Sequence, residues 1–208
     1  MKSTLLAVIL FLSPTVYGQQ AAELATGIRL QYVLLNDASR WTKWPKGLEQ
    51  QVNMATQLLK QVVIPGTDVG NLANFSDDTA ISLDVVNSTN PDDIATKLVR
   101  KGRGGTNVYG SVVSAETWLS KQESSDRRKV VFLFSDGEDD ASPISLKDAI
   151  RTLQTMRIPV FVIAPSVVEH KKPGKDMKQL ADATGGHAYF VDDSGSFDFA
   201  LLKHDLAR

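Results

Sequence analysis

Three short polar segments carry the residues of this chain that could do chemistry. They are Asp37-Ala-Ser39, Gly104-Gly105-Thr106 and Asp136-Gly137-Glu138. Their carboxylates and hydroxyls are hard oxygen donors, which suit Mg²⁺ or Mn²⁺ better than a soft metal. An ion held by few protein ligands keeps positions open for water or for an oxygen of a partner. We therefore expect a shallow divalent-cation site.

Other kinds of site lack the residues they need. The chain has no cysteine, which excludes disulfides, thiolate metal sites and cysteine nucleophiles. The three histidines, His170, His187 and His204, follow no ligand spacing, so we expect them to be surface or structural residues. There is no Gly-x-Ser-x-Gly elbow and no phosphate-binding glycine loop directly after the first strand. A metal-dependent hydrolase of phosphate or ester substrates stays open, because Asp37 and Asp136 each follow an expected strand.

The stretch from Lys129 to Asp140 is the clearest structural pattern in the chain. Its apolar run, Val130–Phe134, predicts a strand that is buried on both faces, as in the middle of a parallel sheet. Ligands of open α/β sheets bind outside the carboxyl ends of the strands, which is where Asp136 would lie. A plain acidic turn, with Gly137 in a left-handed conformation, is the alternative.

The elements that would position these segments alternate along the chain. Besides 130–134, we expect strands at 28–35, 68–75, 79–86, 159–164 and 187–191, and helices near 45–63, 91–101, 108–119, 145–156, 176–183 and 197–206. Strands 68–75 and 79–86, joined by a tight turn, predict an antiparallel hairpin at the sheet edge. The remaining alternation predicts an α/β sandwich with a mostly parallel sheet.

The N-terminus reads as a secretory signal peptide over residues 1–18. Its apolar core, Leu5–Leu12, follows a positive start and is shorter than the roughly 20 residues that span a bilayer. A buried first strand or helix is the alternative. Residues 19–27 would be a short lead-in and 28–208 a single domain. We expect a secreted or periplasmic chain after cleavage near Gly18, without a transmembrane segment in the mature protein.

Composition is that of an ordinary globular domain. The 208 residues are 42% hydrophobic and 23% charged, which is enough for a full core. The net charge of −1 gives no overall basic field, so we expect no nucleic-acid partner. We expect a monomer.

A basic and aromatic loop follows the first strand. It contains Arg40, Trp41, Lys43 and Trp44. Aromatic residues and arginine dominate binding hot spots, so this loop predicts a partner-binding surface on the same side as the cation site. The alternative is that one tryptophan packs against the first helix.

These motifs together resemble the von Willebrand factor type A (VWA) domain. That family builds a metal-ion-dependent adhesion site from Asp-x-Ser-x-Ser after the first strand, a threonine in a later loop and an aspartate after the fourth strand. Here Asp37-Ala-Ser39-Arg-Trp41, Thr106 and Asp136 stand at those positions, and the resemblance covers about residues 28–191. Segments 104–109 and 134–142 closely resemble a secreted bacterial branch of the family.

The resemblance implies a Rossmann-like three-layer sandwich, with one antiparallel edge strand and helices on both faces of the sheet. It implies that Asp37, Ser39, Thr106 and Asp136 hold Mg²⁺ (or Mn²⁺), directly or through water. It also implies a non-catalytic protein-binding or adhesion module, in which an acidic residue of a protein ligand completes the coordination of the ion.

One departure makes the expected site degenerate. Trp41 stands where the first motif has its second serine, and an indole cannot coordinate the ion. Thr42 is one residue out of register. The loss of a ligand weakens Mg²⁺ binding, so a VWA scaffold without metal is an alternative.

A second Asp-x-Ser-x-Ser match, Asp192–Ser196, follows the last expected strand. The family places that strand at the sheet edge, so we expect a turn there, with Ser194 or Ser196 capping the last helix.

Overall fold

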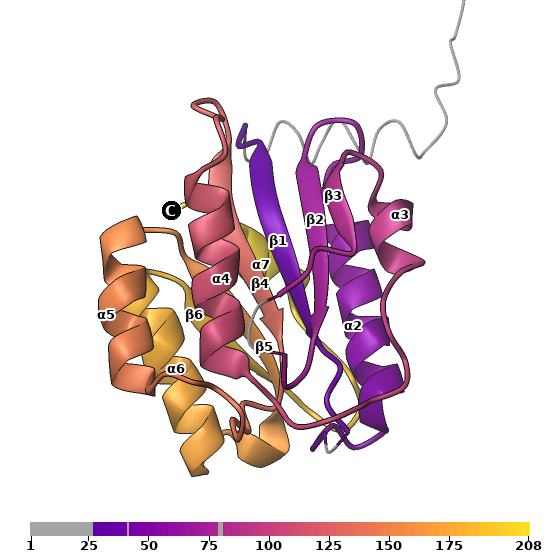
Figure 1. The fold of residues 1–208 in the computed structure, drawn as a ribbon. Coiled ribbons are helices and arrows are strands. Elements are labelled where there is room, and N and C mark those ends of the chain that lie inside the picture. The colour runs from indigo at the N-terminus through magenta and orange to yellow at the C-terminus, as the bar shows by residue number, and fades with distance from the viewer. Residues whose placement is uncertain (1–26, 41, 79–80) are drawn as a thin grey trace, which may run out of the picture.

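A computed structural model describes residues 27–40, 42–78 and 81–208, and Figure 1 shows its fold. The sheet in this part of the chain has six strands in the order β3-β2-β1-β4-β5-β6. The strands are β1 (Leu30–Asp37), β2 (Val69–Phe75), β3 (Val85–Ser88), β4 (Arg128–Phe134), β5 (Val160–Pro165) and β6 (His187–Val191). Every neighbouring pair is parallel except β2 and β3.

Helices cover both faces of this sheet. They are α2 (Gly47–Gln61), α3 (Pro91–Ala95), α4 (Val108–Ser120), α5 (Leu146–Met156), α6 (Lys172–Thr184) and α7 (Phe199–Leu206), with a short 3₁₀ turn η1 (Ser166–Val168). Helices α2, α3 and α7 pack on one face, and α4, α5 and α6 on the other (Figure 1). The predicted three-layer α/β fold is confirmed.

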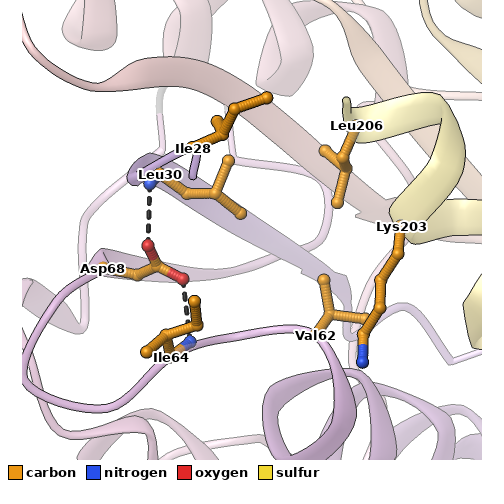
Figure 2. Close-up of a pocket in the computed structure, with 7 residues that line it drawn as sticks. All are labelled: Ile28, Leu30, Val62, Ile64, Asp68, Lys203 and Leu206. Carbon is orange, nitrogen blue, oxygen red and sulfur yellow. Dashed lines mark hydrogen bonds between the residues drawn. The ribbon is translucent and has the colours of Figure 1, made fainter. Parts of the chain in front are cut away.

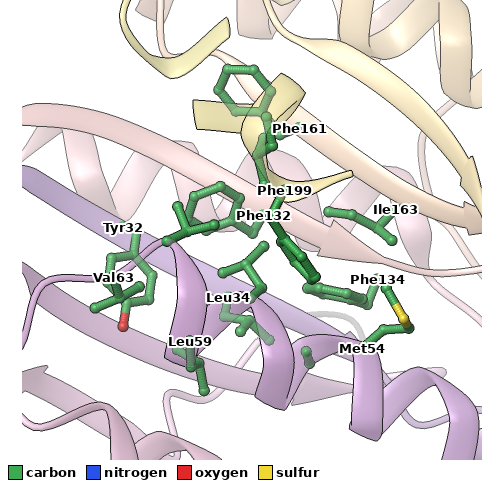
Figure 3. Close-up of a cluster of buried hydrophobic side chains, with 14 of the residues drawn as sticks. Tyr32, Leu34, Met54, Leu59, Val63, Phe132, Phe134, Phe161, Ile163 and Phe199 are labelled. Carbon is green, nitrogen blue, oxygen red and sulfur yellow. The ribbon is translucent and has the colours of Figure 1, made fainter. Parts of the chain in front are cut away.

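The central strands are buried because both of their faces are apolar. Tyr32 and Leu34 of β1 point into the cluster on the α2 side, together with Phe132 and Phe134 of β4 (Figure 3). The alternate residues, such as Val33, pack against the other helical layer. Each such side chain contributes about 1.5–3 kcal/mol when it is fully buried, so β1 and β4 form a rigid base for the loops at their carboxyl ends.

The antiparallel edge is shorter than the sequence predicts. Strand β3 begins at Val85, and residues 79–80 lie outside the described residues. Ile81 and Leu83 lie outside any strand and pack against the α4 side of the core. The backbone N–H of Asp84 donates to Leu72 O (2.7 Å), so pairing with β2 starts only there.

Two helix boundaries also differ from the prediction. Helix α3 ends at Ala95, because the backbone beyond it bonds instead to the side chain of Asn74: Val99 N donates to Asn74 Oδ1 (2.9 Å) and Asn74 Nδ2 donates to Lys97 O (2.9 Å). Helix α6 begins four residues before the predicted start, with Pro173 in its first turn, where the missing N–H of proline leaves no bond unmade.

The predicted signal peptide (1–18) and most of the lead-in lie outside the described residues, and the single domain over 28–208 remains a prediction. None of the helices in the described part of the chain is long and apolar enough to cross a membrane.

Candidate divalent-cation site

Strand pairing brings the two predicted aspartates to one edge of the sheet. β1 and β4 run parallel with Asn36 beside Phe134, so their carboxyl ends meet. Asp37 is the last residue of β1, and Asp136 lies two residues beyond β4. Ser135 joins the two loops, because its hydroxyl donates to Asp37 Oδ2 (2.7 Å).

The Ser39 hydroxyl is the most informative atom of the site. Asp37 and Ser39 are almost fully buried, and Ser39 N donates to Asp37 Oδ1 (2.9 Å). The Ser39 Oγ atom is itself buried, and although it lies close enough to Asp37 to lower the pKa of that carboxyl, it has no well-aligned hydrogen-bond partner among the described residues. A buried polar group left unpaired costs about 1–3 kcal/mol. The orphaned hydroxyl beside two carboxylates therefore fits a site for an oxygen-preferring cation.

Two backbone amides hold the Asp136 carboxylate. Lys43 N donates to Asp136 Oδ2 (2.6 Å), and Glu138 N donates to Asp136 Oδ1 (3.0 Å). The turn from Asp136 to Glu138 needs a glycine at position 137, because Gly137 has a φ of +75°. A Cβ at this position would also lie 2.6 Å from Met177 Cγ. The side chain of Asp136 is thus oriented by its own turn and by the β1–α2 loop.

Thr106 lies in a loop that bonds to both of the other segments. Arg40 N donates to Gly104 O (3.3 Å), which joins this loop to the one after β1. Thr106 N donates to Asp140 Oδ1 (2.6 Å), and Thr106 O accepts from the N–H groups of Asp140 and Ala141 (3.1 and 3.0 Å). The structure therefore gathers all four predicted ligands, Asp37, Ser39, Thr106 and Asp136, at adjoining loops, and their role as ligands remains a prediction.

Asp139 and Asp140 have structural roles that the sequence did not reveal. Asp139 Oδ1 accepts from Val108 N (2.7 Å) in the first turn of α4, and Asp140 holds Thr106 as described. Asp139 thus satisfies an N–H group at a helix start, which has free donors and a favourable dipole for negative charge. These bonds join the loop after β4 to the segment that leads into α4.

The two aspartates of the site are electrostatically unfavourable without a cation. Burial, with a smaller contribution from the charge of Asp136, raises the pKa of Asp37 to about 6, against the lowering effects of the Ser135 hydroxyl and of the amide and hydroxyl of Ser39. Burial also raises the pKa of Asp136, against the amides of Glu138 and Lys43. A divalent cation favours the charged form of both groups. Among the described residues no three acidic or histidine side chains converge, so hydroxyls would have to supply the other ligands.

A buried network of amide side chains positions the ends of β1 and β2. Gln51 Nε2 donates to Asn36 Oδ1 (2.8 Å) and to Asp37 O (2.7 Å). Asn36 Nδ2 donates in turn to Asn74 Oδ1 (2.7 Å), which also holds Val99. Sequence reasoning missed this network. Its only signal was that polar amides interrupt apolar faces at the strand ends and on α2.

The predicted partner-binding surface is only partly exposed. Arg40 and Lys43 are exposed, and Trp41 lies outside the described residues. Trp44 is 3% exposed and packs in the core beside α2, so it does not belong to that surface. The burial of Trp44 agrees with the alternative in which one tryptophan packs against the first helix, and a turn follows directly, with Gly47 N donating to Trp44 O (2.8 Å).

The second Asp-x-Ser-x-Ser match forms an exposed turn. Asp192 Oδ1 accepts from Ser194 N (3.0 Å) and Ser194 Oγ (2.5 Å). The predicted cap is wrong, because Asp198 caps α7 by accepting from Ala200 N (2.9 Å). Strand β5 separates β6 from β4, and this turn contacts the start of α2, where Gln50 Nε2 donates to Asp192 O (3.4 Å), rather than any of the four predicted ligands.

A pocket at the start of β1 also lies apart from the candidate site. Figure 2 shows it between β1, the end of α2 and α7, with an apolar lining and Lys203 at its rim. Asp68 in its wall accepts from Leu30 N (2.7 Å) and Ile64 N (2.8 Å), so this carboxylate closes the turn before β2. None of the predicted ligands lines this pocket.

The sheet order, the antiparallel edge and the loops at the ends of β1 and β4 define a Rossmann-like α/β domain with buried carboxylates and hydroxyls gathered at its carboxyl edge. The model of the von Willebrand factor type A domain family matches residues 33–202, and the chain belongs to this family.

Solved structures with the same fold are distant in sequence. The manganese-loaded TRAP protein of Plasmodium vivax superposes with a TM-score of 0.64 at 14% identity, over 88% of this chain and 75% of that one. Proximal thread matrix protein 1 of the mussel byssus, with a zinc-occupied MIDAS motif, superposes with a TM-score of 0.62 at 13% identity. The match covers 86% of this chain and 48% of the thread protein, so this chain spans about half of its length. BatB from Bacteroides thetaiotaomicron superposes with a TM-score of 0.62 at 10% identity, over 87% of this chain and 98% of BatB. No curated protein matches the chain.

Proposed function

We propose that this chain is an exported, non-catalytic VWA module that binds a protein partner through a divalent cation. Asp37, Ser39, Thr106 and Asp136 would hold the ion, and an acidic side chain of the partner would complete its coordination. The observation that carries this proposal is the buried, unpaired Ser39 hydroxyl beside two buried carboxylates. The manganese-loaded and zinc-occupied relatives support a cation at this place.

The ion would be Mg²⁺ or Mn²⁺ in a degenerate site, because the donors are hard oxygens and Trp41 replaces one hydroxyl. Thr42 is one residue out of register, and its Oγ1 accepts from Trp44 N (3.3 Å), so the loop would have to rearrange for this hydroxyl to replace the missing serine. We place the chain in a secreted bacterial branch of the family. The mussel thread protein, which shares the fold, supports a location outside the cytoplasm.

A hydrolase is the less favoured reading. His187 packs against Tyr189 on β6, and His204 lies beside Asp205 on α7, so neither supports a nucleophile at the ends of β1 and β4. A screen with generic phosphate and ester substrates tests this directly. Turnover that disappears in Asp37→Asn would overturn the non-catalytic proposal.

The cation itself is tested by calorimetric titration of Mn²⁺ and Mg²⁺ into the purified chain. We expect saturable binding that weakens at least tenfold in Asp136→Ala, a change of about 1.4 kcal/mol. Asp192→Ala, in the second Asp-x-Ser-x-Ser segment, is the matched control and should bind like the wild type. Equal absence of binding in the wild type and Asp136→Ala would refute the metal site and leave the fold untouched.

A further inference from the structure

Two loops at the carboxyl edge of the sheet carry basic residues and no acidic ones. The loop after β1 contributes Arg40 and Lys43, and the segment between α3 and α4 contributes Lys97, Arg100, Lys101 and Arg103. All six are exposed, and we call them the basic rim. No acidic residue occurs within 38–48 or 94–115, although the whole chain has a net charge of −1. Positive charge is therefore concentrated in these two segments, whereas the acidic residues of this edge lie in the loops after β2 and β4.

Backbone contacts hold these two loops side by side. Arg103 N donates to Ala38 O (2.9 Å) and Arg40 N donates to Gly104 O (3.3 Å). A Cβ at Gly102 would lie 2.2 Å from Ser39 O, so the approach leaves no room for a side chain. Figure 1 shows the α3–α4 segment crossing beyond the carboxyl end of β1 to reach α4. The basic rim thus borders the candidate cation site.

The amide network fixes the α3–α4 segment to the sheet. Asn74 at the end of β2 bonds to Lys97 O and Val99 N (both 2.9 Å), directly before Arg100 and Lys101. The basic side chains therefore extend from an anchored backbone. Such anchoring reduces the ordering entropy that a partner's binding would have to overcome.

Most of the charge on the rim is available for a partner. Arg103 pairs with Asp78 (3.2 Å) and Lys43 with Glu138 (3.7 Å), and both pairs are exposed. The other four residues form no ion pair with any residue that the structure describes; they are Arg40, Lys97, Arg100 and Lys101.

We propose that the basic rim binds an acidic segment of a protein partner, with several carboxylates spaced over the rim. This inference rests on the proposed binding function and extends it from one carboxylate at the ion to a charged contact area around it. Two acidic residues, Asp78 and Glu138, lie next to the basic rim and pair with Arg103 and Lys43. A polyanion with a charge on every unit would be repelled by these two carboxylates, because some of its charges would lie opposite them. A protein segment can place its carboxylates opposite the cations only.

The charges of the rim would act mainly on association. Complementary potentials steer encounter and raise association rates, and they lose this effect as salt increases. Exposed charges interact over about 8 Å at physiological ionic strength. Binding through the rim should therefore weaken steeply with salt.

The test compares two double charge reversals by fluorescence anisotropy with a labelled peptide of about ten residues in which glutamates alternate with serines. Arg100→Glu/Lys101→Glu alters the rim. Lys60→Glu/Lys121→Glu makes the same charge change at exposed lysines near the carboxyl ends of α2 and α4, at the opposite edge of the sheet. Circular dichroism checks that both variants fold. Each is measured in EDTA and in Mg²⁺, and Asp136→Ala is measured beside them.

We expect the rim variant to bind the peptide about tenfold more weakly than the wild type in both buffers, and the control to stay within about twofold. Asp136→Ala should lose only the gain that Mg²⁺ provides. Equal weakening in the rim variant and the control would overturn the basic rim as a binding surface. Tighter binding of a heparin fragment or a single-stranded DNA of equal charge would overturn a protein as the partner. A rim effect without any Mg²⁺-dependent gain would support the rim and contradict the proposed cation function.

Discussion

Glu116 should make the stability of this domain fall as the pH rises. It lies on α4 with its side chain fully buried, and neither carboxyl oxygen has a hydrogen-bond partner among the described residues. Burial raises its pKa from 4.5 to about 9. The folded protein therefore keeps this carboxyl protonated at neutral pH, whereas the unfolded chain releases the proton.

The size of the effect follows from proton linkage. Between pH 4.5 and about 9, the folded state binds one more proton at Glu116 than the unfolded state. Stability is then full below pH 4.5 and falls by about 1.4 kcal/mol per pH unit until the folded pKa is reached. From pH 5 to pH 8 this amounts to about 4 kcal/mol, a large part of the 5–15 kcal/mol that is typical of a domain.

Glu116→Gln is the perturbation, because glutamine has nearly the same shape and does not titrate. The assay is urea unfolding, followed by far-UV circular dichroism, of both proteins at intervals from pH 5 to pH 8. Groups common to both proteins cancel in the difference between their free energies of unfolding. We expect that difference to shift by about 4 kcal/mol in favour of the variant between the two ends of the range.

Glu49→Gln, at an exposed acidic residue on α2, is the matched control and should keep the wild-type pH dependence. A difference between wild type and Glu116→Gln that stays constant within about 1 kcal/mol across the range would refute the reasoning. It would show that the carboxyl is ionised in the folded state, and hence reached by water or by a counter-charge.

Three further substitutions test the core, the turn and the amide network. Leu34→Ala in the buried face of β1 should lower the free energy of unfolding by about 2–5 kcal/mol in urea, and a loss below 1 kcal/mol would contradict its central place. Gly137→Ala should destabilise by at least about 1–2 kcal/mol, because of its φ of +75° and the contact with Met177, and an unchanged melting temperature would argue against this turn. Asn74→Ala should lower the free energy of unfolding by about 1–3 kcal/mol and speed hydrogen exchange at Val99 N, which loses its acceptor. Asp192→Ala is the control and should leave exchange at Val99 N unchanged.

The parallel core could be predicted because local patterns were enough. Val130–Phe134 is apolar on both faces, and a strand of that kind is stable only between two layers of helices. The edge could not be predicted in the same way. Ile81 and Leu83 alternate with polar residues as in a strand, but the hydrogen bonds between Asp84 and residues of β2 decide where pairing begins. Such bonds join residues about ten apart and leave no periodic trace in the sequence.

The candidate site divides in the same manner. Asp37 and Asp136 could be located because each stands at the end of a buried strand, where parallel pairing brings them together. The hydrogen bond that Asp139 accepts comes from Val108 at the start of α4, which lies 31 residues earlier in the chain. The burial of Trp44 likewise depends on packing against the core rather than on its basic neighbours. These contacts are tertiary, so composition and spacing could not reveal them.

The irregular outer strand has a consequence for how copies of this chain meet. β3 has only four residues, its register with β2 shifts between Gly70 and Leu72, and Asn87 has a left-handed φ of 52°. Asn71 adds to this by accepting from Asn87 N (2.7 Å) through its side chain. A long, regular outer strand offers free N–H and C=O groups on which a second chain can pair. β3 offers no such row, so we expect no sheet-to-sheet polymerisation through this edge at high concentration.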